Sequence, residues 1–410
     1  MNDRLILRLS IGAALAMTGL MPAVAADVGP APTSFMKWET IELPASTGAS
    51  CGNGTPYRFF VNRSTNAANK NKTVVIFEGG GACWEQNSCL GKGGLLAASN
   101  PNGVPKNYMT SGLNLAFFGM STPFSSRNDL LQKVQTQTWN IVYAPYCTGD
   151  VHTGNRVGTY SDATPTKPLT YYHRGGVNGE AMANWLGMYM PKPDKLLVTG
   201  FSAGGTGATA NYGWIRLAMA PKQSALMADS GPLFPAPRDA APADYPSVPL
   251  QNKVREAWGV DGPDGLATKL ISRYPEAGTV DDLGSITTGL AKVFPQDRLG
   301  YATFQQDGIY SDFSYSKFYP EINQATGAAR DKLLNDRWMK DVTHWVGAMT
   351  SVSNIGYYVP VRRSLLKSHC LTIATFSGTG IKEANLPNVG AFVDNLLDES
   401  KPLIRAFEGQ

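Results

Sequence analysis

The sequence predicts an α/β protein in which a mostly parallel central sheet is flanked by helices. Two observations predict this class. Apolar, β-branched runs that end in glycine or a polar turn alternate with stretches of helical spacing. The chain also has 410 residues, 43% of them hydrophobic and 17% charged, which is enough to bury a large core. Alternation of strand and helix favours a parallel sheet, with ligands bound at the carboxyl ends of the strands.

The expected elements follow one another from the amino-terminal third onward. Two stretches with apolar residues at helical spacing, 174–190 and 207–220, are expected to be helices. Residues 232–250, rich in proline and alanine, are expected to form a surface excursion, and 251–345 a lid or insertion. The runs expected to form strands are 58–62, 73–80, 139–146, 195–200 and 224–231.

The first residues have the pattern of a secretory signal. Arg4 and Arg8 precede an apolar stretch that ends in Ala23-Val24-Ala25, which predicts a signal peptide over 1–25 and cleavage before Ala26. Residues 26–410 are expected to form a single domain of a secreted or periplasmic protein. No later segment has eighteen unbroken apolar residues, so no stable membrane anchor is expected. A net charge of +4 without a basic block predicts no nucleic-acid partner, and a monomer is expected.

Ser202 stands in the sequence Gly200-Phe201-Ser202-Ala203-Gly204, which matches G-x-S-x-G. The motif follows the expected strand 195–200 and precedes the expected helix 207–220. In a nucleophile elbow the turn between strand and helix is so tight that the flanking side chains must be small, and the serine hydroxyl is exposed above the sheet. A phosphate-binding loop would need a lysine followed by serine or threonine, and none follows. Ser202 is therefore a candidate nucleophile, the alternative being a turn with an idle serine.

A nucleophilic serine needs a base, and the chain has four histidines. In α/β-hydrolases, which carry this elbow, the order along the chain is serine, acid, histidine. This order excludes His152 and His173. His344 lies in a helical pattern, whereas His369 stands near the carboxyl end, where the loop after a late strand delivers the base. His369 is favoured.

The acid must lie between Ser202 and His369, which excludes Asp394. Asp229 ends the expected strand after the elbow helix, and Asp307 and Asp312 lie later in the chain. Spacing alone does not choose among these three, and each is equally suited to a turn or a helix cap.

Three consecutive glycines follow the expected strand 73–80 in "FEGGGACW". Without side chains, their backbone N–H groups can approach a substrate oxygen, as in the HGGG-type loop of esterases, with Glu78 where a histidine often stands. Amides of Gly80 or Gly81, together with that of Ala203, are expected to form an oxyanion hole.

All five cysteines follow the predicted signal peptide, so at least one is unpaired or joined to another molecule. Cys83 and Cys89 enclose a short loop and form the natural local pair, and the other connectivities cannot be deduced from spacing. No C-x₂-C or H-x₃-H spacing occurs, and no metal site is expected.

Several motifs occurring in order resemble the pectin acetylesterase family, which includes Notum-type carboxylesterases. They are "FEGGGACWEQNSC", "YCTGDVH", "GFSAGG", "ADSGPLF", the region of Asp307, and "SHC". The resemblance implies an α/β-hydrolase-like fold and makes Ser202 the nucleophile, Asp307 the acid and His369 the base. It also implies the disulfides Cys83–Cys89 and Cys51–Cys147, which leaves Cys370 unpaired.

The function expected from these residues is that of a secreted serine carboxylic-ester hydrolase without metal or organic cofactor. Its expected substrate is an acylated carbohydrate, most simply an acetylated polysaccharide, or a small ester. Two alternatives stay open: a carboxylesterase for other short-chain or lipid acyl esters, and a non-catalytic glycan-binding protein.

Overall fold

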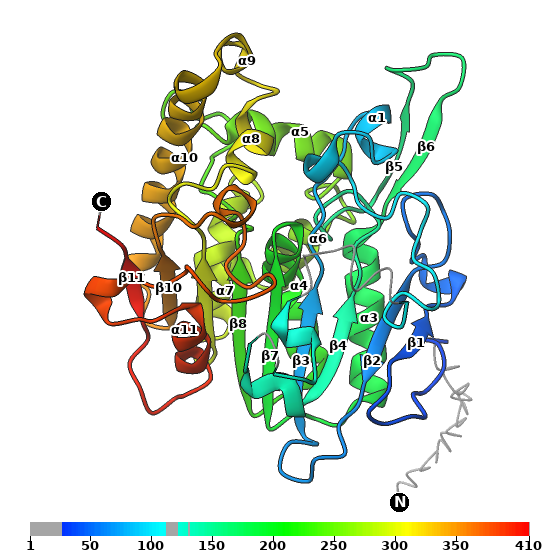
Figure 1. Cartoon of the computed structure of the whole chain (residues 1–410). Helices are drawn as coiled ribbons and strands as arrows, with labels where there is room; N and C mark the ends of the chain where they lie inside the picture. Colours follow the sequence, from blue (N-terminus) through cyan, green and yellow to red (C-terminus); the bar gives the residue numbers. More distant parts are fainter. Residues whose placement is uncertain (1–26, 112–121, 130–131, 410) are drawn as a thin grey trace, which may run out of the picture.

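A nine-stranded sheet forms the centre of the molecule (Figure 1). The computed structural model of the chain describes residues 27–111, 122–129 and 132–409. The strand order is β1-β2-β4-β3-β7-β8-β9-β10-β11. β1 and β2 pair antiparallel with their neighbours, and every pair from β4 to β11 is parallel. The strands are β1 (Glu39–Glu42), β2 (Arg58–Asn62), β3 (Lys72–Phe77), β4 (Asn140–Ala144), β7 (Lys195–Phe201), β8 (Gln223–Asp229), β9 (Arg298–Ala302), β10 (Ile355–Val359) and β11 (Arg405–Phe407).

Helices cover both faces of this sheet. On one face α4 (Ala203–Met219) packs against β3, β7 and β8, and α3 (Gly175–Tyr189) packs against α4. On the other face α11 (Val389–Leu396) contacts β8, β9 and β10. Two successive residues of β9 demonstrate the two faces, because neighbouring side chains of a strand alternate. Gly300 lies against Leu396 of α11, and the Tyr301 hydroxyl donates to the Thr287 carbonyl on the side of α4.

The middle strands are buried on both faces, which explains their continuous apolar sequences. Val74, Val75 and Ile76 of β3 and Leu196 to Val198 of β7 have no exposed surface. The five expected strands match β2, β3, β4, β7 and β8, and the two expected helices match α3 and α4. α4 begins at Ala203, four residues before the expected start, because the helix grows directly out of the turn at Ser202.

The expectation of a lid or insertion over 251–345 was too broad. β9 lies within that range and is a central strand of the sheet. Its sequence, RLGYA, is short and contains an arginine and a glycine, so it has no continuous apolar run. The range also contains most of α10 (Gly327–Thr350), which contacts β10 and belongs to the layers around the sheet.

The segment between β8 and β9 contains α5 (Val248–Trp258), α6 (Leu266–Arg273) and α7 (Ile286–Val293). Two shorter helices, α8 (Tyr310–Tyr315) and α9 (Pro320–Gln324), precede α10. Across the upper end of the sheet in Figure 1 stand α1 (Gln86–Cys89) and a separate antiparallel hairpin of β5 (Arg156–Tyr160) and β6 (Leu169–His173).

The signal peptide predicted over 1–25 lies outside the described residues. Among the helices of the described part, none combines the length and the apolar character needed to cross a membrane.

Candidate active site

The side chains of Ser202, His369 and Asp307 form one hydrogen-bonded chain. The Ser202 hydroxyl lies 2.7 Å from His369 Nε2, and His369 Nδ1 lies 2.8 Å from Asp307 Oδ2. Because Asp307 Oδ2 accepts the hydrogen bond of the Nδ1–H group, Nε2 is the nitrogen left to accept a hydrogen bond from the serine. His369 is 6% and Asp307 1% exposed, which keeps these hydrogen bonds away from competing water. A serine hydroxyl, an imidazole and a carboxylate in this order can perform acyl transfer.

Ser202 lies in the turn between β7 and α4, with φ 56° and ψ −128°, a conformation that is strained for a residue other than glycine. The turn is closed by backbone contacts at its glycines. A Cβ on Gly200 would lie 2.1 Å from the Gly204 carbonyl oxygen, and one on Gly204 would lie 2.0 Å from that of Phe77. The spacing of small residues around Ser202 is therefore required by steric fit.

Asp307 lies in the loop after β9. Its Oδ1 accepts the amide hydrogens of Ile309 (3.0 Å) and Tyr310 (2.8 Å), which leaves Oδ2 for His369. The other two candidates for the acid have different partners. Asp312 forms an ion pair with Arg330, and Asp229 does not bond to the imidazole.

Asp229, at the end of β8, holds the backbone on both sides of the site. Its carboxylate accepts the amide hydrogens of Leu371 (2.9 Å) and Thr372 (2.7 Å), directly after His369. Its carbonyl oxygen accepts the amide hydrogen of Ser202. Asp229 has no exposed surface. From the sequence Asp229 was only a candidate acid, and its position after a strand did not indicate that it holds two backbone segments together.

The loop that carries His369 has an unusual backbone. Leu366, Lys367 and Ser368 have φ of 48°, 51° and 61°, and Cys370 has 63°. Residues other than glycine rarely adopt this left-handed region. Besides Asp229, the loop is fixed by the Ser368 hydroxyl, which donates to the Arg363 carbonyl.

The remaining histidines lie elsewhere. His152 is buried, and its Nε2 lies 2.8 Å from the Glu78 carbonyl oxygen, where it supports the loop after β3. His173 is buried between the Thr148 carbonyl and the Tyr160 hydroxyl. Burial lowers the pKa of both imidazoles to about 4. His344 lies on α10 with its ring against Tyr245.

A small cavity of about 20 Å³ lies against Ser202 and His369, enough for one water molecule. Gly81 and Ala203 line it, and in the described part of the chain their amides have no hydrogen-bond acceptor. The amide of Ala82 also lies there but donates to the Leu96 carbonyl. Gly80, the third expected donor, does not line the cavity. Apolar side chains form the rest of its wall: Leu95, Leu96, Val151, Ile309 and Phe313, with Tyr310.

The structure contains the disulfides Cys51–Cys147 and Cys83–Cys89, and Cys370 is free and buried. Burial raises the pKa of the Cys370 thiol well above its usual value. Among the described residues, Cys83, Cys89 and His173 bring three potential metal-ligand atoms within 4.8 Å of one another. The two sulfurs are bonded to each other, however, and the metal ligand is the free thiolate.

Comparison with protein families identifies the chain. The model of the pectinacetylesterase family matches residues 31–242, about half of the sequence. The chain belongs to the pectinacetylesterase family. Membership makes the protein an esterase-type hydrolase. The matched range contains the triple glycine, Ser202 and Asp229, whereas Asp307 and His369 lie beyond it.

A solved structure of the Wnt deacylase Notum from Drosophila has the same fold as this chain. The two chains superpose with a TM-score of 0.56 at 16% sequence identity, over 88% of this chain and 95% of that one. The likeness establishes an α/β-hydrolase fold, with a large and mostly parallel sheet flanked by helices.

Proposed function

We propose that this protein is an exported serine carboxylesterase that removes small acyl groups, acetyl first, from a polysaccharide. The observation that carries the proposal is the hydrogen-bonded chain Ser202–His369–Asp307 beside two free amides. The two disulfides support export, because such bonds persist in oxidising compartments.

In the proposed mechanism, His369 Nε2 takes the proton of the Ser202 hydroxyl while Oγ attacks the ester carbonyl carbon. The oxygen of the tetrahedral intermediate accepts hydrogen bonds from the amides of Gly81 and Ala203. The intermediate collapses, the C–O bond to the alcohol breaks, and His369 gives its proton to the leaving alcohol oxygen. Water then attacks the acyl-serine in the same way and releases the acid. Asp307 keeps Nδ1 protonated and stabilises the positive imidazole.

The size of the cavity supports a small acyl group. The cavity is small, about 20 Å³, and its wall of leucine and aromatic side chains suits an apolar group such as the methyl of an acetyl ester. The apolar wall is also compatible with the alternative, an esterase for other short-chain or lipid acyl esters. Rates with a series of nitrophenyl esters from acetate to octanoate separate the two, because the proposal expects a maximum at acetate.

The first experiment is labelling with a fluorophosphonate probe, followed by peptide mapping. We expect labelling at Ser202 in the wild type, and we expect Ser202→Ala to lose labelling and at least about 10³-fold in kcat. Ser314→Ala is the matched control, because Ser314 is buried on α8 and its hydroxyl has no hydrogen-bond partner in the described residues.

An unlabelled wild type, or a Ser202→Ala variant that still hydrolyses acetate esters, would refute the proposed nucleophile. A folded wild-type protein that binds glycans without turnover would instead support the non-catalytic alternative.

A further inference from the structure

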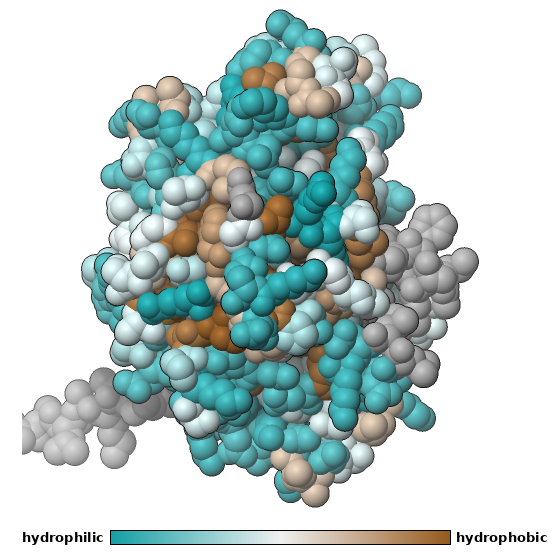
Figure 2. Space-filling model, turned by 60° about the vertical axis from the view of Figure 1, so that its left-hand side comes forward, coloured by the Kyte–Doolittle hydropathy of each residue, from teal (hydrophilic) through white to brown (hydrophobic). Residues whose placement is uncertain are grey.

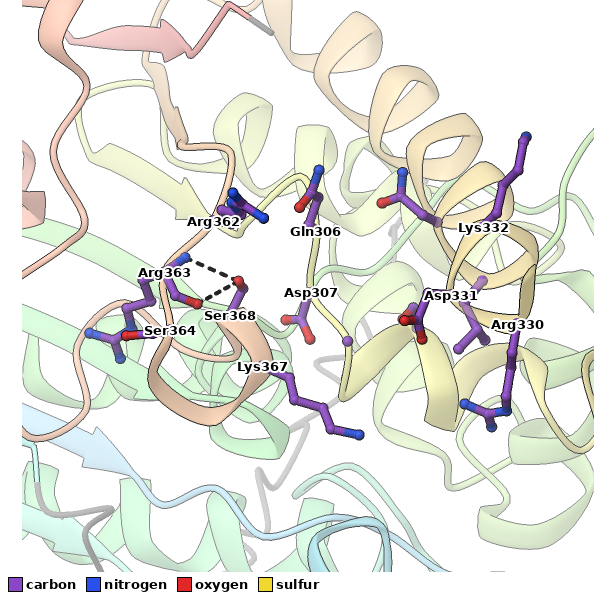
Figure 3. Close-up of a pocket in the computed structure, with 14 residues that line it drawn as sticks. Gln306, Asp307, Arg330, Asp331, Lys332, Arg362, Arg363, Ser364, Lys367 and Ser368 are labelled. Atoms are coloured by element: carbon purple, nitrogen blue, oxygen red, sulfur yellow. Dashed lines mark hydrogen bonds between the residues drawn. The ribbon is translucent and has the colours of Figure 1, made fainter. Parts of the chain in front are cut away.

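Two loops of the candidate active site are fixed in different ways. The loop of His369 is fixed in part by one of its own side chains, since the Ser368 hydroxyl accepts from the amide of the buried Arg363 and donates to its carbonyl (Figure 3). This loop borders a groove on a face of the molecule where hydrophilic residues predominate (Figure 2). The loop after β3, which carries the proposed oxyanion donor Gly81, contains three consecutive glycines, 79–81, and these have no side chains for such bonds.

The three glycines need an external constraint to keep one conformation. Gly80 and Gly81 have φ of 144° and 60°, and glycine loses more conformational freedom on folding than any other residue. An oxyanion hole is effective when its amides already point to the place where the negative charge develops. The contacts that hold this loop therefore determine whether the Gly81 amide can act as a donor.

Glu78, the residue before the glycines, is bonded through both its side chain and its backbone. Its Oε1 accepts the Tyr108 hydroxyl at 2.7 Å, and its Oε2 accepts the Tyr146 amide at 2.9 Å. Its carbonyl oxygen lies 2.8 Å from His152 Nε2, and its amide donates to the Ala144 carbonyl at 3.0 Å. Glu78 is buried, which keeps these bonds away from competing water. The carboxyl group thus connects the start of the glycine loop to residues 30 and 68 positions away in the sequence.

Close steric contacts connect this position to the nucleophile. A Cβ on Gly79 would lie 2.9 Å from the Ser202 Cβ, and a Cβ on Gly204 would lie 2.8 Å from the Glu78 carbonyl carbon. No further side chain fits between the glycine loop and the turn of Ser202. A shift of the Glu78 backbone would therefore change the position of the glycines relative to Ser202.

We propose that Glu78 is a positioning residue for the oxyanion hole. The bonds of its carboxyl group with Tyr108 and Tyr146 hold the start of the glycine loop, and this keeps the Gly81 amide directed at the substrate oxygen. Glu78 does not line the cavity at Ser202, so it acts through the loop and not on the ester. The effect on catalysis rests on the proposed function, whereas the effect on the loop does not.

Two substitutions separate the bonds of Glu78 from its size. Glu78→Gln keeps both bonds, because the amide oxygen accepts from the Tyr146 amide and the Tyr108 hydroxyl can turn to accept from the amide nitrogen. Glu78→Met has a side chain of similar length, but its thioether is only a weak acceptor. Gln137→Met is the matched control, because Gln137 is also buried and its side chain bonds to backbone carbonyls before β4, at the opposite end of the sheet from Ser202.

Steady-state kinetics with an acetate ester tests the effect on catalysis. We expect Glu78→Met to lower kcat by about 10- to 100-fold, because the Gly81 amide is displaced from the oxyanion. KM should change little, since this bond is stronger in the transition state than in the bound ester. A trifluoromethyl ketone, which forms a tetrahedral adduct with an activated serine, should bind this variant more weakly by a similar factor. Glu78→Gln and Gln137→Met should retain the wild-type kcat.

Hydrogen–deuterium exchange tests the loop without any catalysis. The amides of Ala82 and Cys83 donate to the Leu96 and Gly149 carbonyls, so we expect slow exchange in the wild type. Both amides should exchange at least about tenfold faster in Glu78→Met, because the loop opens more often. Glu78→Gln and Gln137→Met should exchange at these amides like the wild type. Thermal unfolding verifies that each variant is folded.

Either of two results would overturn the inference: a folded Glu78→Met variant with the wild-type kcat, or one with wild-type exchange at Ala82 and Cys83. If Glu78→Met does not fold, Tyr108→Phe removes one of the two bonds and should show the same changes to a smaller extent. A folded Tyr108→Phe variant with wild-type kcat and exchange would then overturn it. A wild type that hydrolyses no ester would refute the proposed function instead, and faster exchange in Glu78→Met would still support the holding of the loop.

Discussion

Asp229 shows how one buried carboxylate can position several groups at once. It connects the Ser202 backbone to the loop of His369 without bonding to the imidazole itself. It also accepts the Thr372 hydroxyl, at 2.7 Å. At the residue scale, the geometry of the site therefore depends on a group that does not bond to the imidazole.

Asp229→Asn is expected to lower kcat by up to about 100-fold, because an amide nitrogen then faces backbone N–H groups and His369 moves. KM for a small ester should change little, since Asp229 does not reach the cavity. Steady-state kinetics measures both. Asp341→Asn is the control: Asp341 is also buried but bonds to Tyr315. An unchanged kcat in Asp229→Asn would contradict the positioning role and show that the carboxylate only stabilises the fold.

The raised pKa of Glu78 predicts that the stability of the folded protein depends on pH. Burial raises its pKa to about 7, although the Tyr146 amide and the Tyr108 hydroxyl donate to it. Between pH 4.5 and 7 the Glu78 carboxyl group is protonated in the folded protein and ionised in the unfolded chain. The stability that this group contributes is therefore lost as the pH rises. Glu78→Gln cannot lose a proton. The Tm of this variant, relative to wild type, should therefore rise from pH 5 to pH 8, as differential scanning fluorimetry would measure. A constant difference would contradict this.

At the scale of elements, the motifs that could be predicted were those with a strict steric or periodic requirement. The elbow at Ser202 needs glycines at fixed positions, and β3, β7 and β8 are continuous apolar runs. β9 and β10 were missed because RLGYA and IGYYV are short and interrupted by glycine.

The choice between Asp229 and Asp307 could not be made from spacing, because both follow a strand. It came from the resemblance to a family, and the structure brings Asp307 to His369. The expected donor Gly80 does not line the cavity. Contacts distant in sequence, such as the hydrogen bond from the Ser99 amide to the Gly80 carbonyl, hold the path of this loop.

Replacing either of two helical glycines by alanine should change the unfolding free energy in opposite directions. In α4, Gly204→Ala places a Cβ 2.0 Å from the Phe77 carbonyl oxygen, so it should destabilise the protein by ~2 kcal/mol or more. In α10, Gly347 has no atom within 4 Å of the added Cβ, and Gly347→Ala should stabilise by about 1 kcal/mol. Urea unfolding measures both. The same sign for the two variants would contradict the steric explanation.

On the scale of the whole molecule, the two disulfides close loops of very different length. Cys51–Cys147 joins residues 96 apart and ties the β1–β2 side of the sheet to the loop after β4, whereas Cys83–Cys89 spans 6 residues. A bond that closes a longer loop removes more entropy from the unfolded chain. We expect Cys51→Ser/Cys147→Ser to lose about 4 kcal/mol of unfolding free energy and Cys83→Ser/Cys89→Ser about 2 kcal/mol. Equal losses in urea titrations would show that local strain dominates.

The left-handed run at Leu366, Lys367 and Ser368 affects when, during folding, the loop of His369 takes up its final shape. Each such residue costs about 1 kcal/mol or more, so the loop cannot hold this shape before its surroundings have formed. Those surroundings include the ends of β8 and β10 and the buried Arg363. Ser202 and His369 are 167 residues apart in the sequence, so the loop reaches the serine only through long-range contacts. A partly folded chain in which these surroundings have not yet formed thus holds Ser202 without the imidazole beside it.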